Sequence, residues 1–474
     1  MTTENSRRLF LKNAGALSMA GVAGPFAMNL AAFGQAAAAG VDADANDYKA
    51  LVCVFLLGGN DHANTLVPYD PVSYATYRAE RPALATPWDA LSPTLLNPKE
   101  ALPGGRQYAL APQLAPLLAP FNDGKMAVML NIGTLTEPLD KAQYKNFPAK
   151  RPSKLFSHND QQATYQAAGS ARNSTGWGGR LGDEFDQNTA NATFTCINVG
   201  SGGVFSSGAS TLGYQVSAKG GAVAIKAVKE PLFGSTACRD EMKRLITAPS
   251  AHLFEDHHTR VVARSVKYEE LLSPALLQAP ASGAFTPNEP LGEQLSMVAR
   301  IISKQAQLLP SATGGAKRQV FFVTLGGFDT HDSLNEEHPQ LLTAVGNAMA
   351  AFHNEMARQQ IGNQVTLFTA SDFGRTLNSD GDGSDHGWGS MHFVLGGAVK
   401  GGYYGEAPKM GSKAEADNGD NDVGRGRLLP RMAVDQFAGQ LATWFGVPAT
   451  AIDTVLPNLK NFKDDPLSLG FMTA

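Results

Sequence analysis

Three short apolar segments that each end at an aspartate beside glycine constrain the fold of this chain most strongly. They are LVCVFLLGGND, which ends at Asp61, VFFVTLGGFDTH, which contains Asp329 and His331, and VTLFTASDFGR, which contains Asp372. Each is too short for a helix, apolar on both faces and rich in β-branched and aromatic residues, as buried parallel strands are. Amphipathic helical segments at 291–309 and 341–356 separate later strands. The pattern therefore predicts an α/β fold with a mostly parallel central sheet.

The ends of these strands predict a site. In open α/β sheets the ligand crevice lies at the carboxyl ends of the strands, so the acidic and imidazole side chains are expected at one edge. Taken singly, each aspartate is also explained by a turn that satisfies local N–H groups, and Asp372 by a pair with Arg375. The repetition favours a metal or catalytic cluster, which the following segment SDHGWGSMH extends. The predicted metal ligands are Asp61, Asp329, His331, Asp372, Asp385, His386 and His392.

The ligand types restrict the ion. Carboxylates and imidazoles without thiolates suit zinc, manganese or another divalent first-row metal, and magnesium or calcium where oxygen dominates. One or two ions are expected.

The N-terminus predicts export. Ser6-Arg7-Arg8-Leu9-Phe10-Leu11-Lys12 precedes a weakly apolar stretch and a run of small residues at 36–39, which matches a twin-arginine signal. A permanent membrane anchor fits less well, because Gly21, Gly24 and Pro25 interrupt the stretch. We therefore expect residues 1–39 to be removed and the protein to be periplasmic or secreted.

Composition excludes some partners. The net charge of −4 and the lack of a basic stripe argue against nucleic acid. No later segment approaches about 18 uninterrupted apolar residues, so no stable membrane span is expected after signal removal. Residues 40–474 are interpreted as a single domain with a Gly/Ser-rich insertion around 200–290. Cys53 is expected to be an inert core thiol, and a Cys196–Cys238 disulfide remains possible.

The motifs together resemble a known family. TASDFGR is similar to the strand-end TSDHG of sulfatases and the alkaline phosphatase superfamily. The export signal with GGNDHANTLVP, SHNDQQ, GGFDTHDS, SDFGRT, DHGWG and VDQFAGQLATWFGV resembles the DUF1501 family, which is placed in that superfamily. The resemblance spans essentially the whole mature chain. It implies an alkaline phosphatase-like three-layer α/β/α fold and one or two divalent metals. It also implies metal-binding roles for Asp61, Asp329, His331, Asp372 and His386.

Two departures from the superfamily concern the site. Phe373 stands where a metal-binding histidine is common, and Asp385 or His392 is a possible replacement ligand. The usual nucleophile has no clear counterpart, and the absence of C-x-P-x-R and C-x-A-x-R argues against an ordinary formylglycine sulfatase. Ser157, at the predicted N-terminus of the SHNDQQ helix, is the candidate nucleophile, although a plain N-cap serine explains it as well.

The predicted function is an exported metal-dependent hydrolase of phosphate or sulfate esters. Arg375 is expected to stabilise substrate oxygens and Asn60 to make a secondary polar contact. One alternative is a metal-stabilised binding or structural protein without turnover, and another is a metal-free serine hydrolase that uses Ser157. His62 and His158 lie near the motifs, but lone histidines are more often loop or surface residues. Three further histidines, His252, His257 and His258, lie on a charged helix and are expected to be solvent-exposed.

Overall fold

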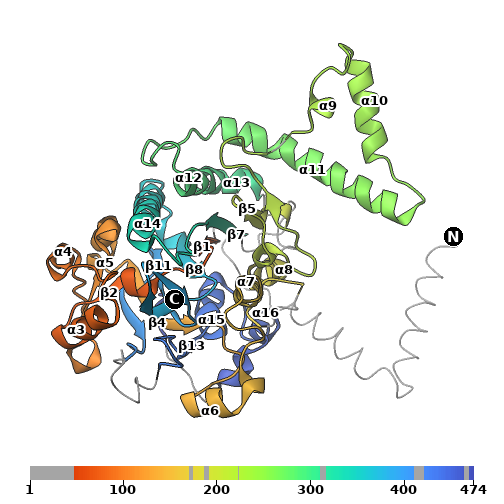
Figure 1. Ribbon diagram of the computed structural model, residues 1–474. Helices are drawn as coiled ribbons and strands as arrows, with labels where there is room; N and C mark the ends of the chain where they lie inside the picture. The colour runs from red at the N-terminus through yellow and green to blue at the C-terminus, as the bar shows by residue number, and fades with distance from the viewer. Residues whose placement is uncertain are drawn as a thin grey trace, which may run out of the picture.

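A nine-stranded sheet forms the centre of the molecule (Figure 1). The computed structural model describes residues 47–169, 174–185, 192–222, 224–309, 317–409, 421–463 and 469–473. The strand order is β12-β4-β11-β8-β1-β7-β5-β6, with β13 paired to β4. The strands are β1 (Tyr48–Leu56), β4 (Met126–Gly133), β5 (Cys196–Asn198), β6 (Tyr214–Gln215), β7 (Lys317–Leu325), β8 (Val365–Ser371), β11 (Ser390–Gly396), β12 (Gly402–Gly405) and β13 (Met432–Ala433).

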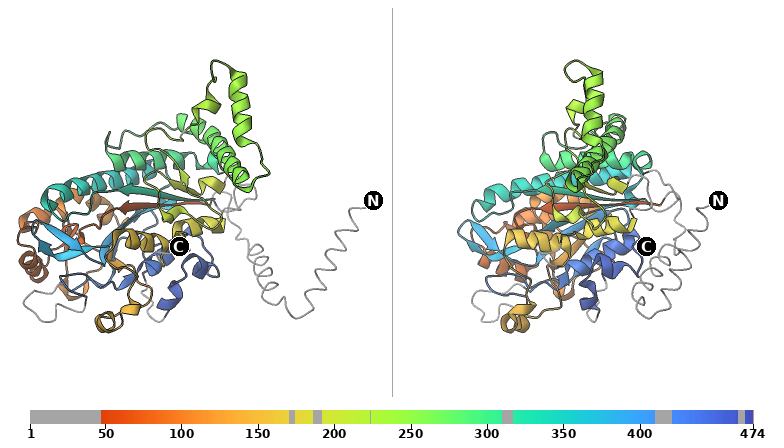
Figure 2. Two further views of the ribbon diagram at one scale, coloured as in Figure 1. Left: turned by 45° about the vertical axis from the view of Figure 1, so that its right-hand side comes forward. Right: turned by 90° about the vertical axis from the view of Figure 1, so that its right-hand side faces the viewer.

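Side chains that point alternately to the two faces of the sheet create an apolar core on each face. In β1, Val52 and Val54 belong to the core on one face, whereas Cys53 and Phe55 belong to the core on the other. Because successive side chains of a strand point to opposite faces, a strand that is apolar throughout needs cover on both sides. Helices supply that cover (Figure 2). One face carries α12 (Pro290–Ser303), α13 (Gln305–Leu308) and α14 (Leu334–Arg358), and the other carries α7 (His158–Ala167), α8 (Trp177–Phe185), α15 (Val434–Phe445) and α16 (Ile452–Val455).

The sheet is mostly parallel, as the sequence predicts. β1 pairs in parallel with β7 and β8, and only β11, among the described strands of this sheet, runs antiparallel to its neighbours. The register aligns Leu56 with Leu325 of β7 and with Ser371 of β8. The three predicted strand ends therefore lie at one edge, and the α/β/α fold class is confirmed.

Smaller elements surround the central sheet. On the β4 side the described elements are η1 (His62–Asn64), β2 (Leu66–Pro68), α3 (Pro71–Glu80), α4 (Trp88–Leu91), η2 (Ser92–Thr94), η3 (Pro103–Gly105), β3 (Tyr108–Leu110), η4 (Pro112–Leu117), α5 (Leu118–Asn122), α6 (Lys141–Asn146) and η5 (Pro148–Lys150). After β8, the chain forms the two-stranded hairpin β9 (Arg375–Asp380) and β10 (Gly383–His386). The remaining short helices are η7 (Ala192–Phe194), η8 (Val204–Ser206), η9 (Gly362–Gln364) and η10 (Leu459–Phe462).

The region interpreted as a Gly/Ser-rich insertion contains more regular structure than its composition predicts. It contributes β6 to the central sheet and then forms α9 (Lys226–Lys229), α10 (Thr236–Thr247) and α11 (Leu253–Leu277), which project from the body (Figure 1). Cys53 is buried as expected, but Cys196 and Cys238 are both free, so a disulfide between them is wrong. Cys196 is buried as the first residue of β5, whereas Cys238 is exposed on α10.

The predicted signal at 1–39 lies outside the described residues. Among the residues that are described, no helix combines the length and the apolar character that crossing a membrane requires.

Candidate metal centre

The aligned ends of β1, β7 and β8 bring polar side chains together. The chain after β1 turns through Gly58, the chain after β7 reaches Asp329 and His331, and Asp372 directly follows β8. His386 ends β10, and His158 begins α7, a helix on the face opposite α14. Hydrophobic packing of the strands therefore places groups from five separate segments at one edge.

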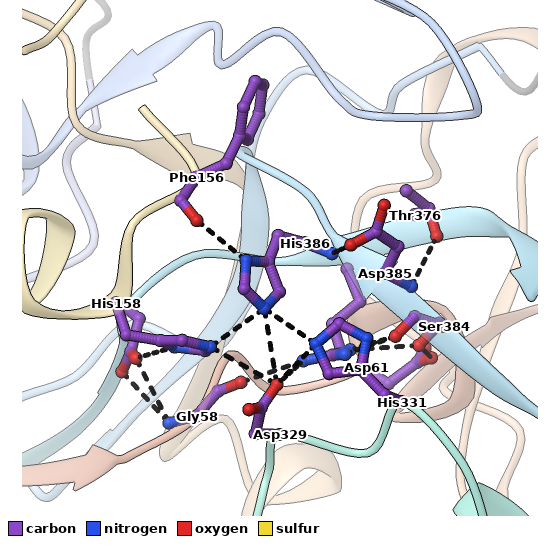
Figure 3. Close-up of polar contacts among 12 residues, drawn as sticks. Gly58, Asp61, Phe156, His158, Asp329, His331, Thr376, Ser384, Asp385 and His386 are labelled. Atoms are coloured by element: carbon purple, nitrogen blue, oxygen red, sulfur yellow. Dashed lines mark hydrogen bonds and ion pairs between the residues drawn. The ribbon is translucent and has the colours of Figure 1, made fainter. Parts of the chain in front are cut away.

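Four ligand-type atoms converge there (Figure 3). His386 Nε2 lies 2.9 Å from His158 Nε2 and 2.9 Å from His331 Nε2. Asp329 Oδ1 lies 3.3, 3.1 and 3.4 Å from the Nε2 atoms of His158, His331 and His386, respectively. Asp329 and His331 are about half exposed, at 47% and 45% of their side-chain surface, so the cluster is open to solvent on that side.

Hydrogen bonds on the far side of two rings fix their tautomers. His158 Nδ1 lies 2.7 Å from Asp372 Oδ2, and His386 Nδ1 lies 2.7 Å from the carbonyl oxygen of Phe156. Both of these partners are acceptors, so each Nδ1 carries the proton and each neutral ring presents a lone pair at Nε2. When both rings are neutral, their two Nε2 lone pairs and the Asp329 carboxylate face one another.

A cation resolves this repulsion. Ligands held 2.0–2.1 Å from a tetrahedral zinc ion are separated by about 3.4 Å from one another, close to the spacings in this cluster. Two overlapping groups of the described residues have ligand atoms near enough to hold an ion: His158, Asp329 and His386, and His331, Asp385 and His386. His386 belongs to both groups, and the donor atoms around it fit a divalent metal.

The charges around the cluster shift several protonation equilibria. The hydrogen bond to Asp372, against the effect of burial, raises the pKa of His158. Burial, together with nearby positive charges, lowers the pKa of His386. Burial opposes ionisation of Asp329, but the hydrogen bond from Arg375 and the neighbouring His158 outweigh it and lower the pKa of that carboxyl. Asp329 is therefore ionised at neutral pH.

The sequence predicts Asp372 as a direct metal ligand, but in the structure its carboxylate binds the outer nitrogen of a candidate ligand, His158. Besides His158 Nδ1, its Oδ2 accepts a hydrogen bond of 2.8 Å from Gln162 Nε2, and the Gly58 N–H donates to both carboxylate oxygens at 3.2 and 3.3 Å. Gln162 and His158 are four residues apart on α7 and so share one face of the helix. A carboxylate that binds the outer nitrogen of a ligating histidine fixes the ring and raises its basicity.

Arg375, predicted to bind substrate oxygens, is fully buried and holds Asp329. Its Nη1 donates to Asp329 Oδ1 at 2.9 Å and to the carbonyl oxygen of Gly58 at 3.0 Å, and its Nε donates to the Ser384 carbonyl oxygen at 2.9 Å. A guanidinium with 0% exposure and these partners cannot also reach a substrate. Its position below the cluster instead fixes the carboxylate of Asp329.

Asp61, predicted as the first-strand ligand, lies behind the cluster in a buried ion pair. Its two oxygens accept from Arg81 Nη1 at 2.9 Å and Nη2 at 2.5 Å, and Oδ2 also accepts from Ser384 Oγ at 2.9 Å. Burial alone would raise the pKa of Asp61, but the Arg81 charge and hydrogen bonds lower it well below its usual range. Asp61 is therefore not part of the cluster. Its carboxylate is paired with Arg81, a residue that no sequence pattern indicated.

Two further predicted residues lie in the core rather than at the cluster. The Asn60 amide bonds with Thr65 and with His338 Nε2 at 3.0 Å and is 1% exposed, so it has no route to a substrate. His392 is equally buried in β11, and its nearest polar contact is 3.5 Å to Thr369 Oγ1. Burial lowers the pKa of His392 to about 3, so it is a neutral core residue.

Asp385 and two arginines form the outer wall. Asp385 Oδ2 accepts from Arg425 Nη1 and Arg427 Nη2, each at 2.9 Å, and Oδ1 accepts from the His386 N–H at 2.7 Å. Arg427 also lies over the Phe156 ring, 4.9 Å from its centroid. Asp385 is near enough to belong to the second ligand group, but its charge is already balanced by the arginines.

Phe373 packs directly against the ligands. Its ring centroid lies 4.8 Å from that of His158 and 4.9 Å from that of His386, and its side chain is buried. Phe373 therefore forms an apolar wall behind two imidazoles.

Ser157 is the N-cap residue of α7 and immediately precedes His158. Its hydroxyl makes no capping bond to the helix backbone and instead donates to Asp160 Oδ2 at 2.7 Å. That hydrogen bond is the main reason that the pKa of Asp160 is lowered. The hydroxyl of this N-cap serine therefore bonds to a side chain of the first helical turn rather than to the helix backbone.

Sequence reasoning missed His158 as a candidate ligand. The signal that could have identified it was present, since His158 and Gln162 share the helix face that begins at the SHNDQQ motif. Arg81, Arg425 and Arg427 carried no comparable signal, because each is brought to the site by tertiary packing alone.

Comparison with known proteins places this geometry in context. The family model described as "Protein of unknown function (DUF1501)" matches residues 48–423. No curated protein matches the chain. Among solved structures, a mutant of the alkaline phosphatase PafA is similar at 10% identity with a TM-score of 0.25, covering 69% of this chain and 63% of that one. The match therefore covers less than two thirds of that phosphatase.

Proposed function

The chain belongs to the DUF1501 family, and we propose that it is an exported metal-dependent hydrolase of phosphate or sulfate esters. The single observation that carries the proposal is the approach of His386 Nε2 to the Nε2 atoms of His158 and His331, each at 2.9 Å, with Asp329 Oδ1 lying 3.1 to 3.4 Å from all three. Such a group of acceptor atoms, with two ring protons directed away, is suited to binding a cation.

The donor set favours a particular kind of ion. Three imidazoles and one carboxylate, with no thiolate, suit zinc or a similar first-row metal better than magnesium or calcium, which prefer oxygen. A metal bound there would act as a Lewis acid on an ester oxygen and lower the pKa of a hydroxyl or water. His158, His331, His386 and Asp329 would hold it.

The fixed charges favour an anionic substrate. Arg425 also pairs with a further carboxylate, that of Asp380, but a divalent cation bound at the cluster would still add positive charge that an anion can neutralise. Three carboxylates and three guanidiniums otherwise balance at the cluster. These groups are Asp329, Asp372, Asp385, Arg375, Arg425 and Arg427. A phosphate or sulfate ester supplies the required negative charge.

Ser157 is the proposed nucleophile. It lies at the N-terminus of the ten-residue helix α7, where the backbone N–H groups and the helix dipole favour negative charge on an oxygen. Its proton already points to Asp160, 2.7 Å away, so deprotonation has an ionised acceptor in place. Attack of the serine oxygen on the phosphorus or sulfur would release the alcohol and leave an ester on Ser157, which water then hydrolyses.

A second function from another class is a metal-stabilised exported binding or structural protein. Phe373 favours it, because the apolar ring replaces a polar residue beside the two imidazoles. In that case metal removal lowers the melting temperature, but no ester is turned over.

The test measures metal, stability and hydrolysis separately. We expect His386→Ala to lose both the metal and hydrolysis of aryl phosphates or sulfates, whereas His257→Ala, an exposed histidine of α11, changes neither. A wild-type protein that contains metal and is inactive on a broad ester panel would support the binding protein. Activity that resists complete chelation would instead support a metal-free serine hydrolase.

A further inference from the structure

The segment that leads into α7 has a left-handed backbone at two residues that are not glycine. Lys154 has a φ of 48° and Phe156 has a φ of 75°. In this region the Cβ atom of an L residue crowds the following carbonyl oxygen, so glycine adopts it readily and phenylalanine rarely does. Such strain persists only where the surrounding contacts enforce it, and it is concentrated at functional sites. The contacts of Phe156 therefore indicate what the strained turn is for.

The backbone of Phe156 contacts the cluster of imidazoles. Its carbonyl oxygen lies 2.7 Å from His386 Nδ1 (Figure 3). The next two residues are Ser157, the proposed nucleophile, and His158, a candidate ligand whose Nε2 lies 2.9 Å from His386 Nε2. Three consecutive residues thus supply a carbonyl, a hydroxyl and an imidazole to the site, and the φ of the first sets how all three are presented.

The chain before Phe156 is fixed in place. Gln161 Nε2 donates to the carbonyl oxygens of Ser153 at 3.1 Å and Lys154 at 3.4 Å, and Gln161 Oε1 accepts from Thr134 Oγ1 at 2.6 Å. Gln161 is completely buried, so these hydrogen bonds have no competition from solvent. Because the preceding carbonyl groups are held, the strain is relieved only by rotation at Phe156, which would turn its carbonyl away from His386.

The ring of Phe156 opposes that rotation. The guanidinium of Arg427 lies over it, 4.9 Å from the ring centroid, and the ring also packs against the apolar cluster that contains Trp388. Arg427 Nε donates to the His386 carbonyl oxygen at 2.7 Å, and its Nη2 donates to Asp385 Oδ2 at 2.9 Å. One arginine therefore holds both the backbone of His386 and the side chain of the residue that bonds to its ring.

We infer that Phe156 is a positioning residue of the proposed metal centre. The contact between its ring and Arg427 holds the strained turn, and the turn directs the Phe156 carbonyl at His386 Nδ1. An acceptor at the outer nitrogen fixes the ring and keeps its proton there, which leaves Nε2 free for a cation. The inference rests on the proposed metal-dependent function. It assigns the role to the backbone of Phe156, with the ring as the clamp.

Two substitutions at one position separate this role from the filling of space. Phe156→Ala and Phe156→Gly both remove the ring, and competition with a chromophoric chelator measures their affinity for zinc. Phe156→Ala is expected to bind zinc about 10–100-fold more weakly than the wild type, because alanine returns to a negative φ once the clamp is lost. Phe156→Gly is expected to stay within a few-fold of the wild type, since glycine keeps the positive φ without strain.

Gln360 provides the matched control. It also has a left-handed φ, of 62°, but it is exposed between α14 and β8, at the end of the sheet opposite the cluster. Gln360→Ala and Gln360→Gly are both expected to bind zinc as the wild type does. Equal losses of affinity in Phe156→Ala and Phe156→Gly would overturn the inference, because a residue that only fills space is not rescued by glycine.

A second readout needs no metal. Nitrogen-15 NMR of the chelated protein, labelled at histidine, reports which ring nitrogen of His386 carries the proton, and His386→Ala identifies its signals. The wild type and Phe156→Gly are expected to carry it on Nδ1, whereas Phe156→Ala is expected to carry it partly on Nε2. An unchanged tautomer in Phe156→Ala would overturn the inference. A wild type that takes up no zinc would instead contradict the metal centre, and the tautomers would still decide the role of Phe156.

Discussion

His158 and His386 direct their Nε2 atoms at each other across 2.9 Å, while the Nδ1 atom of each ring faces an acceptor 2.7 Å away. The outer acceptors are a carboxylate and a backbone carbonyl, so they hold both ring protons outside the cluster. The inner atoms are therefore left as lone pairs. A cation bound between the rings would accept both lone pairs.

Asp372→Asn is expected to weaken metal binding by about 10–100-fold without unfolding the protein. The amide oxygen can still accept from His158 Nδ1, but the negative charge that makes the imidazole a better ligand is lost. Competition with a chromophoric chelator measures the affinity. Asp89→Asn, an exposed carboxylate of α4, is the control and should bind metal as the wild type does. Equal affinities for Asp372→Asn and wild type would contradict the supporting role.

Asp61→Asn is expected to destabilise the fold and leave the metal in place. Removing the carboxylate leaves Arg81 buried without its counter-charge, and breaking a buried pair in this way costs about 3–5 kcal/mol. Urea unfolding and elemental analysis of the same sample measure both quantities. Loss of metal at unchanged stability would mean that Asp61 is a ligand after all.

Ser157→Ala is expected to abolish ester hydrolysis while metal content and melting temperature stay as in the wild type. The serine oxygen is the proposed nucleophile, and its only side-chain partner is Asp160 on the solvent side of α7. Steady-state assay of an aryl ester, with metal content measured in parallel, gives the answer. If the variant still hydrolyses the ester, the attacking nucleophile is water and not Ser157.

Stability is expected to fall on acidification because three histidines are buried in their neutral form. Burial lowers the pKa of His62 and of His338 to about 4 and that of His392 to about 3, from a usual 6.5. Below 6.5 the unfolded chain takes up protons that the folded chain does not. The stabilisation is thus complete above pH 6.5 and lost as the pH falls toward 4, by up to about 1.4 kcal/mol per pH unit for each histidine.

Urea unfolding of the chelated protein at pH 7 and pH 5 tests this dependence. Asp435 and His158 act in the opposite direction, because burial raises the pKa of Asp435 to about 7 and the hydrogen bond to Asp372 raises that of His158, so they reduce the difference that the three buried histidines cause. His392→Leu should reduce the difference between the two pH values, whereas the exposed His257→Gln should not. Identical free energies at both pH values in the wild type would refute the prediction.

The fold, and the strand ends at which the site lies, could be predicted from local sequence patterns. The apolar runs that form β1, β7 and β8 needed no long-range information, and the strand-end rule placed Asp329, His331 and Asp372 at one edge. A helix period likewise identified α12 and α14 near their observed positions.

The rest of the site depended on partners that are distant in sequence. Asp61 has the same local setting as Asp329, but Arg81 from the end of α3 neutralises it. Arg375 looked available for a substrate, yet burial at the base of the cluster commits it to Asp329. His158 looked like a lone surface histidine until α7 was packed against the end of β8. A strand end therefore predicts where polar residues gather, and tertiary pairing decides which of them face the site.

Elemental analysis of the protein after native purification tests the central claim most directly. We expect at least one zinc or similar first-row ion per chain, lost in His386→Ala and retained in His257→Ala. A wild-type protein that contains no divalent metal, and that takes up none when zinc is added, would contradict the account.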